Sequence, residues 1–101
     1  KQNYIYEGKV ESISPQDLID EFKLVRIDFL KLDIEGSEFK IFKNPTWLKI
    51  VKIISMELHA EPEDENTLYI KNILEKYNFS VNIIKNGPAT YCFALNQDFV
   101  T

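Results

Sequence analysis

Two continuous apolar runs dominate the pattern of hydrophobic and polar positions along the chain. Residues 27–34 and 50–57 contain few polar positions, as expected for parallel strands covered on both faces. Between them, Phe39 and Phe42 recur at helical spacing, so residues 37–43 predict a short helix. A strand–helix–strand unit requires a right-handed crossover, which makes the two strands parallel neighbours. The pattern therefore predicts an α/β fold.

The pattern after this unit predicts a helix and a hairpin. Beyond an acidic loop at residues 61–66, apolar side chains at helical spacing form one amphipathic face. These side chains are Ile70, Ile73, Leu74 and Tyr77. Residues 79–84 and 90–95 then predict two antiparallel strands joined by a turn that contains Gly87 and Pro88.

The pattern before this unit is weaker. Residues 4–13 are strand-like, with a turn expected at Gly8. Ser14 can cap a helix, and Pro15 suits the first helical position. The apolar residues of this helix are expected to face the core; they are Leu18, Ile19 and Phe22.

Composition and charge exclude several classes of protein. The chain of 101 residues is 45% hydrophobic and 13% aromatic, which indicates one folded domain over residues 1–101. Its net charge of -4 argues against nucleic-acid binding through a cationic surface. No apolar run is long enough to span a membrane. Cys92 is the only cysteine, which suits a reducing compartment and predicts a cytoplasmic location.

Acidic and imidazole side chains follow both apolar strands. Asp33 and Glu35 end the first strand, and Glu57 and His59 end the second. The carboxyl ends of neighbouring parallel strands meet at one edge of the sheet, so we expect a single crevice there. Carboxylates and imidazole can act as general bases, and together they could also bind a divalent metal. Structural roles remain open, since Asp33 could cap the helix after Gly36 and His59 could be merely solvated.

Residues 27–38 read IDFLKLDIEGSE, and this stretch closely resembles the central signature of the FkbM-type methyltransferases. The flanking sequence agrees in order. Residues 10–19 resemble the short strand and helix that precede the signature, and residues 54–59 resemble the next strand with its E-x-H ending. The resemblance covers residues 10–95.

The resemblance implies half of a Rossmann-like class I methyltransferase sheet. Two parallel strands with a crossover helix would be followed by a C-terminal antiparallel hairpin. The glycine-rich loop that binds the cofactor in the first half of such enzymes is absent, and no G-x-G pattern occurs. The chain starts at Lys1 and its only methionine is Met56, so we expect a piece of something longer.

By this resemblance, Asp33 and Gly36 line the methionine end of S-adenosylmethionine. Glu35, Glu57 and His59 would bind the substrate or remove a proton from the accepting hydroxyl. The expected activity is O-methylation of a sugar or another hydroxylated small molecule, with little activity in this piece alone. No metal is assigned to the site.

Two other classes of function remain open at this stage. The chain could be a non-catalytic binding or oligomerisation module of half-Rossmann type, or carry a metal-dependent hydrolytic site. In the half-fold, the edge of the strand at residues 27–33 would be bare and apolar. We therefore expect a homodimer through this edge, an exchange of elements, or coverage by residues 4–13.

Overall fold

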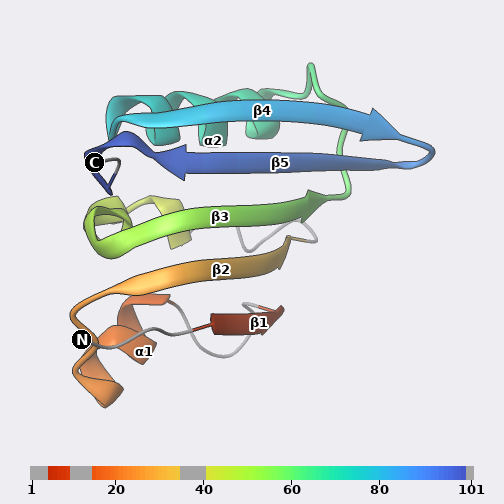
Figure 1. Ribbon diagram of the computed structural model, residues 1–101. Helices are drawn as coiled ribbons and strands as arrows, with labels where there is room; N and C mark the ends of the chain where they lie inside the picture. The colour runs from red at the N-terminus through yellow and green to blue at the C-terminus, as the bar shows by residue number, and fades with distance from the viewer. Residues whose placement is uncertain (1–4, 10–14, 35–40, 100–101) are drawn as a thin grey trace.

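A computed structural model describes residues 5–9, 15–34 and 41–99 and shows a five-stranded mixed sheet with helices (Figure 1). The strand order is β1-β2-β3-β5-β4. In chain order, the elements are β1 (Ile5–Lys9), α1 (Pro15–Phe22), β2 (Ile27–Ile34), the 3-10 helix η2 (Pro45–Ile50), β3 (Val51–Leu58), α2 (Glu65–Lys76), β4 (Phe79–Asn86), β5 (Ala89–Asn96) and the 3-10 helix η3 (Gln97–Phe99).

The predicted parallel pair is confirmed. β2 and β3 run parallel as direct neighbours, in a register that places Leu30 opposite Ile54 and Leu32 opposite Met56. The predicted crossover helix at residues 37–43 lies mostly outside the described residues. The described part of this connection ends in η2, where Pro45 occupies the start of the 3-10 helix.

The edge of β2 that was expected to be bare is covered. β1 pairs with it in parallel, from Ile5 opposite Phe29 to Lys9 opposite Asp33. Of the three outcomes expected for the edge at residues 27–33, coverage by the N-terminal residues is the one observed. The turn expected at Gly8 is wrong, because Gly8 lies within β1 opposite Leu32.

The predicted hairpin is confirmed, and its second strand enters the sheet. β5 pairs antiparallel with β3 on one side and with β4 on the other. Gly87 has a φ of +64° at the turn, a left-handed conformation that glycine adopts without strain. β4 is consequently at the edge of the sheet, although it precedes β5 in the chain.

The core lies between the sheet and the helices on one face. On β2 and β3, alternate side chains are fully buried, as the two-residue period of strands requires. These are Leu30, Leu32, Ile54, Met56 and Leu58. The predicted face of α2 is confirmed, since Ile70 and Leu74 are buried and Ile73 and Tyr77 pack against the same cluster.

Aromatic side chains of the connection close this core. The rings of Phe42 and Trp47 lie 5.6 Å apart, and both side chains are buried. The indole Nε1 of Trp47 donates a hydrogen bond of 3.1 Å to the carbonyl of Ile41. Phe39 lies outside the described residues. On α1, Ile19 packs against the core, but the expected burial of Phe22 is wrong because its side chain is 60% exposed.

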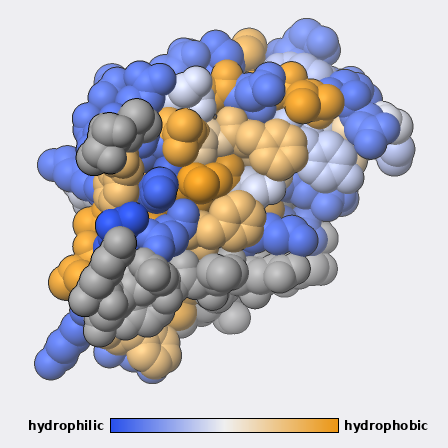
Figure 2. All heavy atoms as spheres, viewed as in Figure 1, coloured by the Kyte–Doolittle hydropathy of each residue, from blue (hydrophilic) through white to orange (hydrophobic). Residues whose placement is uncertain are grey.

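The opposite face of the sheet is only partly covered. In Figure 1, α2 lies behind β4 and β5, so Figure 2 views the molecule from the open face and shows apolar side chains gathered there. Phe93, Leu95 and Ile84 belong to this face and are each about two-fifths exposed, at 43%, 39% and 44%. In the part of the chain that the structure describes, no helix is long and apolar enough to cross a membrane.

Candidate functional site

The carboxyl ends of β2 and β3 lie side by side and bring predicted site residues together. Asp33 is directly opposite Glu57 in the parallel register. Both follow the buried residues of the core by one position, so they project from the opposite, open face of the sheet. The strands position these side chains because apolar residues fix the register of the pair, and a slip by one residue would turn every side chain over.

His59 lies just beyond β3 and contacts the end of β2. Its Nε2 is 3.3 Å from Oδ1 of Asp33, across 26 residues of chain. The side chains are partly open to solvent, with exposed fractions of 49% for His59 and 36% for Asp33. The two strand ends therefore form one polar site, in which an imidazole lies beside a carboxylate.

Glu57 faces the same side of the sheet and is half-buried. Its other neighbour across the sheet is Tyr91 on β5, whose ring stacks on that of Phe93 at 6.5 Å. Among the described residues, the carboxylate of Glu57 makes no hydrogen bond or ion pair. It is therefore available to a ligand, with aromatic side chains beside it.

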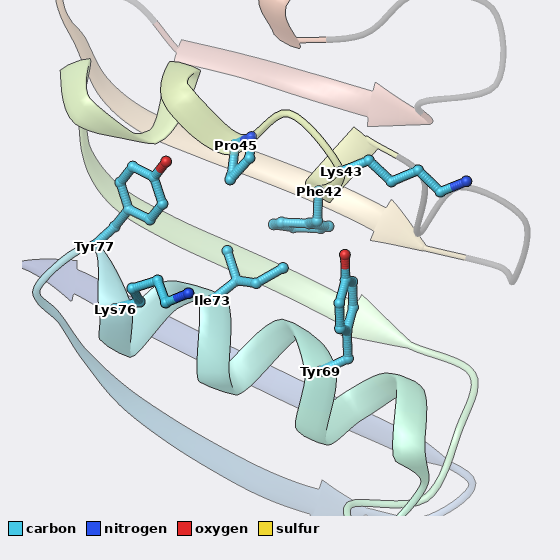
Figure 3. A pocket seen from close by; sticks show the side chains of 7 residues that line it. All are labelled: Phe42, Lys43, Pro45, Tyr69, Ile73, Lys76 and Tyr77. Carbon is cyan, nitrogen blue, oxygen red and sulfur yellow. The ribbon is translucent and has the colours of Figure 1, made fainter.

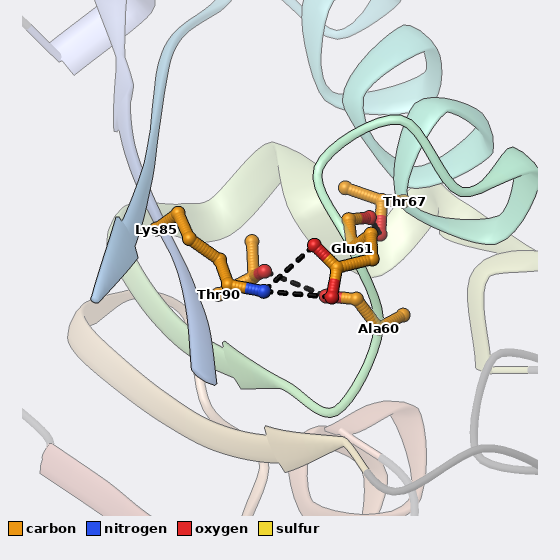
Figure 4. A network of polar contacts seen from close by, with 5 residues as sticks. All are labelled: Ala60, Glu61, Thr67, Lys85 and Thr90. Atoms are coloured by element: carbon orange, nitrogen blue, oxygen red, sulfur yellow. Dashed lines mark hydrogen bonds and ion pairs between the residues drawn. The ribbon is translucent and has the colours of Figure 1, made fainter. Parts of the chain in front are cut away.

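The loop that carries His59 is anchored by side chains of the hairpin (Figure 4). Oγ1 of Thr90 donates a hydrogen bond of 2.6 Å to the carbonyl of Ala60. Nζ of Lys85 lies 2.7 Å from each carboxylate oxygen of Glu61. Lys85 and Thr90 are paired across the hairpin, so one strand pair holds two successive loop residues.

The start of α2 holds the other end of this loop. Oγ1 of Thr67 donates to the carbonyl of Glu61 at 2.9 Å, and this carbonyl also accepts from the backbone N–H of Asp64 at 3.0 Å. Asp64 is the N-cap of α2, and its Oδ1 accepts from the backbone N–H of Asn66 at 2.8 Å. The loop after His59 is therefore fixed at both ends.

Sequence reasoning missed these supporting residues. No sequence motif contains Thr90, Lys85 or Thr67. Each of them contacts the loop only because the fold brings its strand or helix beside it. The predicted hairpin could have indicated that Lys85 and Thr90 lie opposite each other. It does not indicate that both side chains also contact the loop after His59.

Two predicted site residues, Glu35 and Gly36, lie outside the described residues, so their predicted roles stay predictions. Within the ranges described, no group of three histidine, cysteine or acidic side chains is arranged to hold a metal ion. Asp33 and His59 contact each other in the structure. The resemblance had assigned them different roles, Asp33 in binding the cofactor and His59 in binding or deprotonating the substrate.

Comparison with known proteins shows which family and which fold the chain matches. A model of the "Methyltransferase FkbM domain" family matches residues 2–81. The match begins and ends earlier than the expected range of residues 10–95. No curated protein matches the chain.

Among solved structures, the chain is similar to M. capricolum TrmK in complex with S-adenosyl-homocysteine, described there as the natural cofactor product. The TM-score is 0.55 at 11% sequence identity, over 84% of this chain. At this identity the likeness shows the fold alone, and the chain spans only 37% of that protein.

The family match extends over most of the described elements, from β1 into β4. The predicted signature supplies β2 and its carboxyl end, and the sheet has the fold of a methyltransferase. The chain therefore belongs to the FkbM methyltransferase family.

Proposed function

We propose that this chain is the C-terminal part of an S-adenosylmethionine-dependent methyltransferase that acts on a hydroxyl oxygen of a sugar or a similar small molecule. The observation that carries the proposal is the contact between His59 and Asp33 at 3.3 Å, at the carboxyl ends of neighbouring parallel strands. Ligands of open α/β sheets bind in this position. Family membership supports the reaction class, and the acceptor is inferred from the chemistry of the site.

In this proposal, His59 removes the proton from the accepting hydroxyl. When Nε2 carries the proton of the neutral ring, it donates to Asp33, and Nδ1 remains an acceptor. Asp33 thereby fixes the tautomer and the orientation of the ring and stabilises the imidazolium that forms. Glu57 accepts hydrogen bonds from other substrate hydroxyls, since its carboxylate has no partner among the described residues.

The described residues fit one wall of a cofactor site and no more. Of the described glycines, Gly8 is paired within β1 and Gly87 forms the hairpin turn, so neither makes a cradle at the strand ends. Asp33 stands at the edge where the cofactor would lie. The bound cofactor supplies the methyl group, and we propose that other parts of a longer enzyme hold most of it.

A calorimetric titration tests this proposal. S-adenosylmethionine would be titrated into the 101-residue chain and into the complete product of its gene. Methyl transfer to a panel of sugars would then be measured with the complete product, its His59→Gln variant and a Glu63→Gln control on the exposed loop. We expect binding and transfer by the complete product, loss of transfer in His59→Gln and full activity in Glu63→Gln. Absence of cofactor binding by both proteins would overturn the proposal.

A second candidate is the non-catalytic binding module. The observation in its favour is the open face of the sheet, where Phe93, Leu95 and Ile84 are substantially exposed. Exposed apolar patches of this kind mark interaction surfaces. A stable oligomer of the complete product without cofactor affinity would favour this candidate. The homodimer was expected through the edge of β2 at residues 27–33, which β1 covers.

A further inference from the structure

A pocket of about 320 Å³ lies on the helical side of the sheet, away from Asp33 and His59 (Figure 3). It is formed between α2 and the segment that leads into η2. Its volume is within the range of small-molecule sites and is about twice that of a cavity that holds benzene. The site described above uses none of its residues.

The pocket has an apolar floor and aromatic walls. Phe42, which is 1% exposed, and the half-buried Ile73 form the floor, with Pro45 beside them. Figure 3 shows Tyr69 and Tyr77 on either side, with both hydroxyls directed toward the segment that carries Phe42 and Pro45. Among the described residues, neither hydroxyl makes a hydrogen bond. A flat apolar ligand could therefore lie on the floor between two available hydroxyl groups.

Two lysine side chains give the rim a positive charge. Lys43 and Lys76 line the pocket, and within the described ranges neither forms an ion pair. Two other lysines form ion pairs, Lys71 with Glu75 at 3.0 Å and Lys85 with Glu61 at 2.7 Å, whereas Lys49 and Lys52 form none among the described residues. The rim therefore holds unpaired cations in a chain whose net charge is -4.

The two lysines are placed differently. In Figure 3 the ammonium of Lys76 points in toward Ile73, whereas Lys43 extends outward along the rim. A lysine side chain is flexible, so Lys43 can swing toward a bound anion at some cost in side-chain entropy. Lys76 is therefore expected to contribute more to binding than Lys43.

We propose that this pocket binds a small aromatic carboxylate, with its rings on Phe42 and Ile73 and its carboxylate at Lys76. The apolar floor selects the ring system, because burying it removes apolar surface from water. The ammonium groups and tyrosine hydroxyls select the anion, because all of them donate hydrogen bonds to carboxylate oxygens. The site is separate from the methyl-transfer site, and the inference does not depend on the proposed function.

Naphthalene-2-carboxylate is a suitable probe, and the neutral naphthalene-2-carboxamide is its matched control. Both would be titrated into the 101-residue chain, with affinity measured by calorimetry and the location of binding by NMR of the isoleucine methyl groups. We expect the carboxylate to bind more tightly than the amide and to shift the Ile73 methyl signal. Lys76→Gln should weaken carboxylate binding about fivefold and the double variant Lys43→Gln/Lys76→Gln about tenfold.

Lys49→Gln is the control for loss of a lysine outside the pocket, and it should leave the affinity unchanged. Tyr69→Phe should weaken the carboxylate by less than Lys76→Gln, because it removes one neutral donor. Equal affinities for carboxylate and amide, or an unchanged affinity in the double lysine variant, would overturn the inference. Shifts at Ile53 or Ile84 on the open face, without a shift at Ile73, would also overturn it.

Discussion

The imidazole of His59 faces the carboxylate of Asp33 across the gap between β3 and β2, with 3.3 Å between Nε2 and Oδ1. The contact joins residues 26 positions apart and depends on the parallel pairing of the two strands. In the proposed function, this contact supplies a proton acceptor, His59, and a group that orients it, Asp33.

If Asp33 acts through His59, the effects of removing them should not add. In the complete enzyme, His59→Gln should lower the rate of methyl transfer by about 100-fold or more, as expected for loss of a general base. Asp33→Asn should cost about tenfold, and the double variant should resemble His59→Gln alone. Single-turnover rates measure all three. If Asp33→Asn lowers the rate of methyl transfer by a further tenfold when His59 is already replaced by Gln, the two residues act independently.

Thr90 should control the stability of the loop that carries His59. Its side chain is fully buried and Oγ1 donates to the Ala60 carbonyl at 2.6 Å. Thr90→Val keeps the shape but leaves this carbonyl without its donor, so the free energy of unfolding should fall by about 1–3 kcal/mol. Urea unfolding measures this change.

Thr90→Ser is the matched variant for this prediction, since it retains the hydroxyl. It should lose less stability than Thr90→Val. If both variants are equally destabilised, packing of the methyl group rather than the hydrogen bond holds the loop. Glu61→Gln removes only an exposed ion pair and should cost less than about 1 kcal/mol.

Asn96 should be one of the most sensitive polar positions of the fold. Its buried side chain donates to the Val51 carbonyl at 2.9 Å and accepts from the backbone N–H of Asp98 at 3.0 Å, which ties the end of β5 to the start of β3. Asn96→Ala should lower the free energy of unfolding by about 2–4 kcal/mol, because it leaves backbone groups unsatisfied. The exposed Asn82→Ala control should stay within about 0.5 kcal/mol. Equal effects in thermal unfolding would contradict this role.

Cys92 should make stability fall at alkaline pH. Burial raises the pKa of its thiol from 9.0 to about 12. The unfolded thiol therefore ionises first, so the stabilisation is complete below about pH 9 and is lost as the pH rises toward 12, by about 1.4 kcal/mol per pH unit. Urea unfolding between pH 8 and pH 10 should show a steeper decline for the native chain than for Cys92→Ala. Identical slopes would refute the contribution of this thiol.

The strongly patterned elements could be predicted from the sequence. The parallel pair β2 and β3, the buried face of α2 and the turn at Gly87 each follow from local periodicity or from one residue with a special backbone preference. The meeting of Asp33 and His59 also followed, because parallel strands bring their carboxyl ends to one edge.

The remaining features depend on long-range contacts that no local pattern encodes. β1 is a short strand with a weak pattern, and its pairing with β2 supplied hydrogen bonds that outweighed the turn tendency of Gly8. Phe22 was predicted on the buried face of α1, yet it is the last residue of this helix and its side chain is exposed. Lys85 and Thr90 reach the loop after His59 only when the hairpin is docked on β3.

The insertion of β5 between β3 and β4 has a consequence for biosynthesis. β4 leaves the ribosome before the strand that connects it to the rest of the sheet, so β4 has no neighbouring strand until β5 has emerged. When only the residues before β5 have emerged, β1, β2 and β3 can form a parallel sheet, whereas β4 is without a neighbouring strand. Loss of this late segment would remove the middle of the sheet rather than trim its edge.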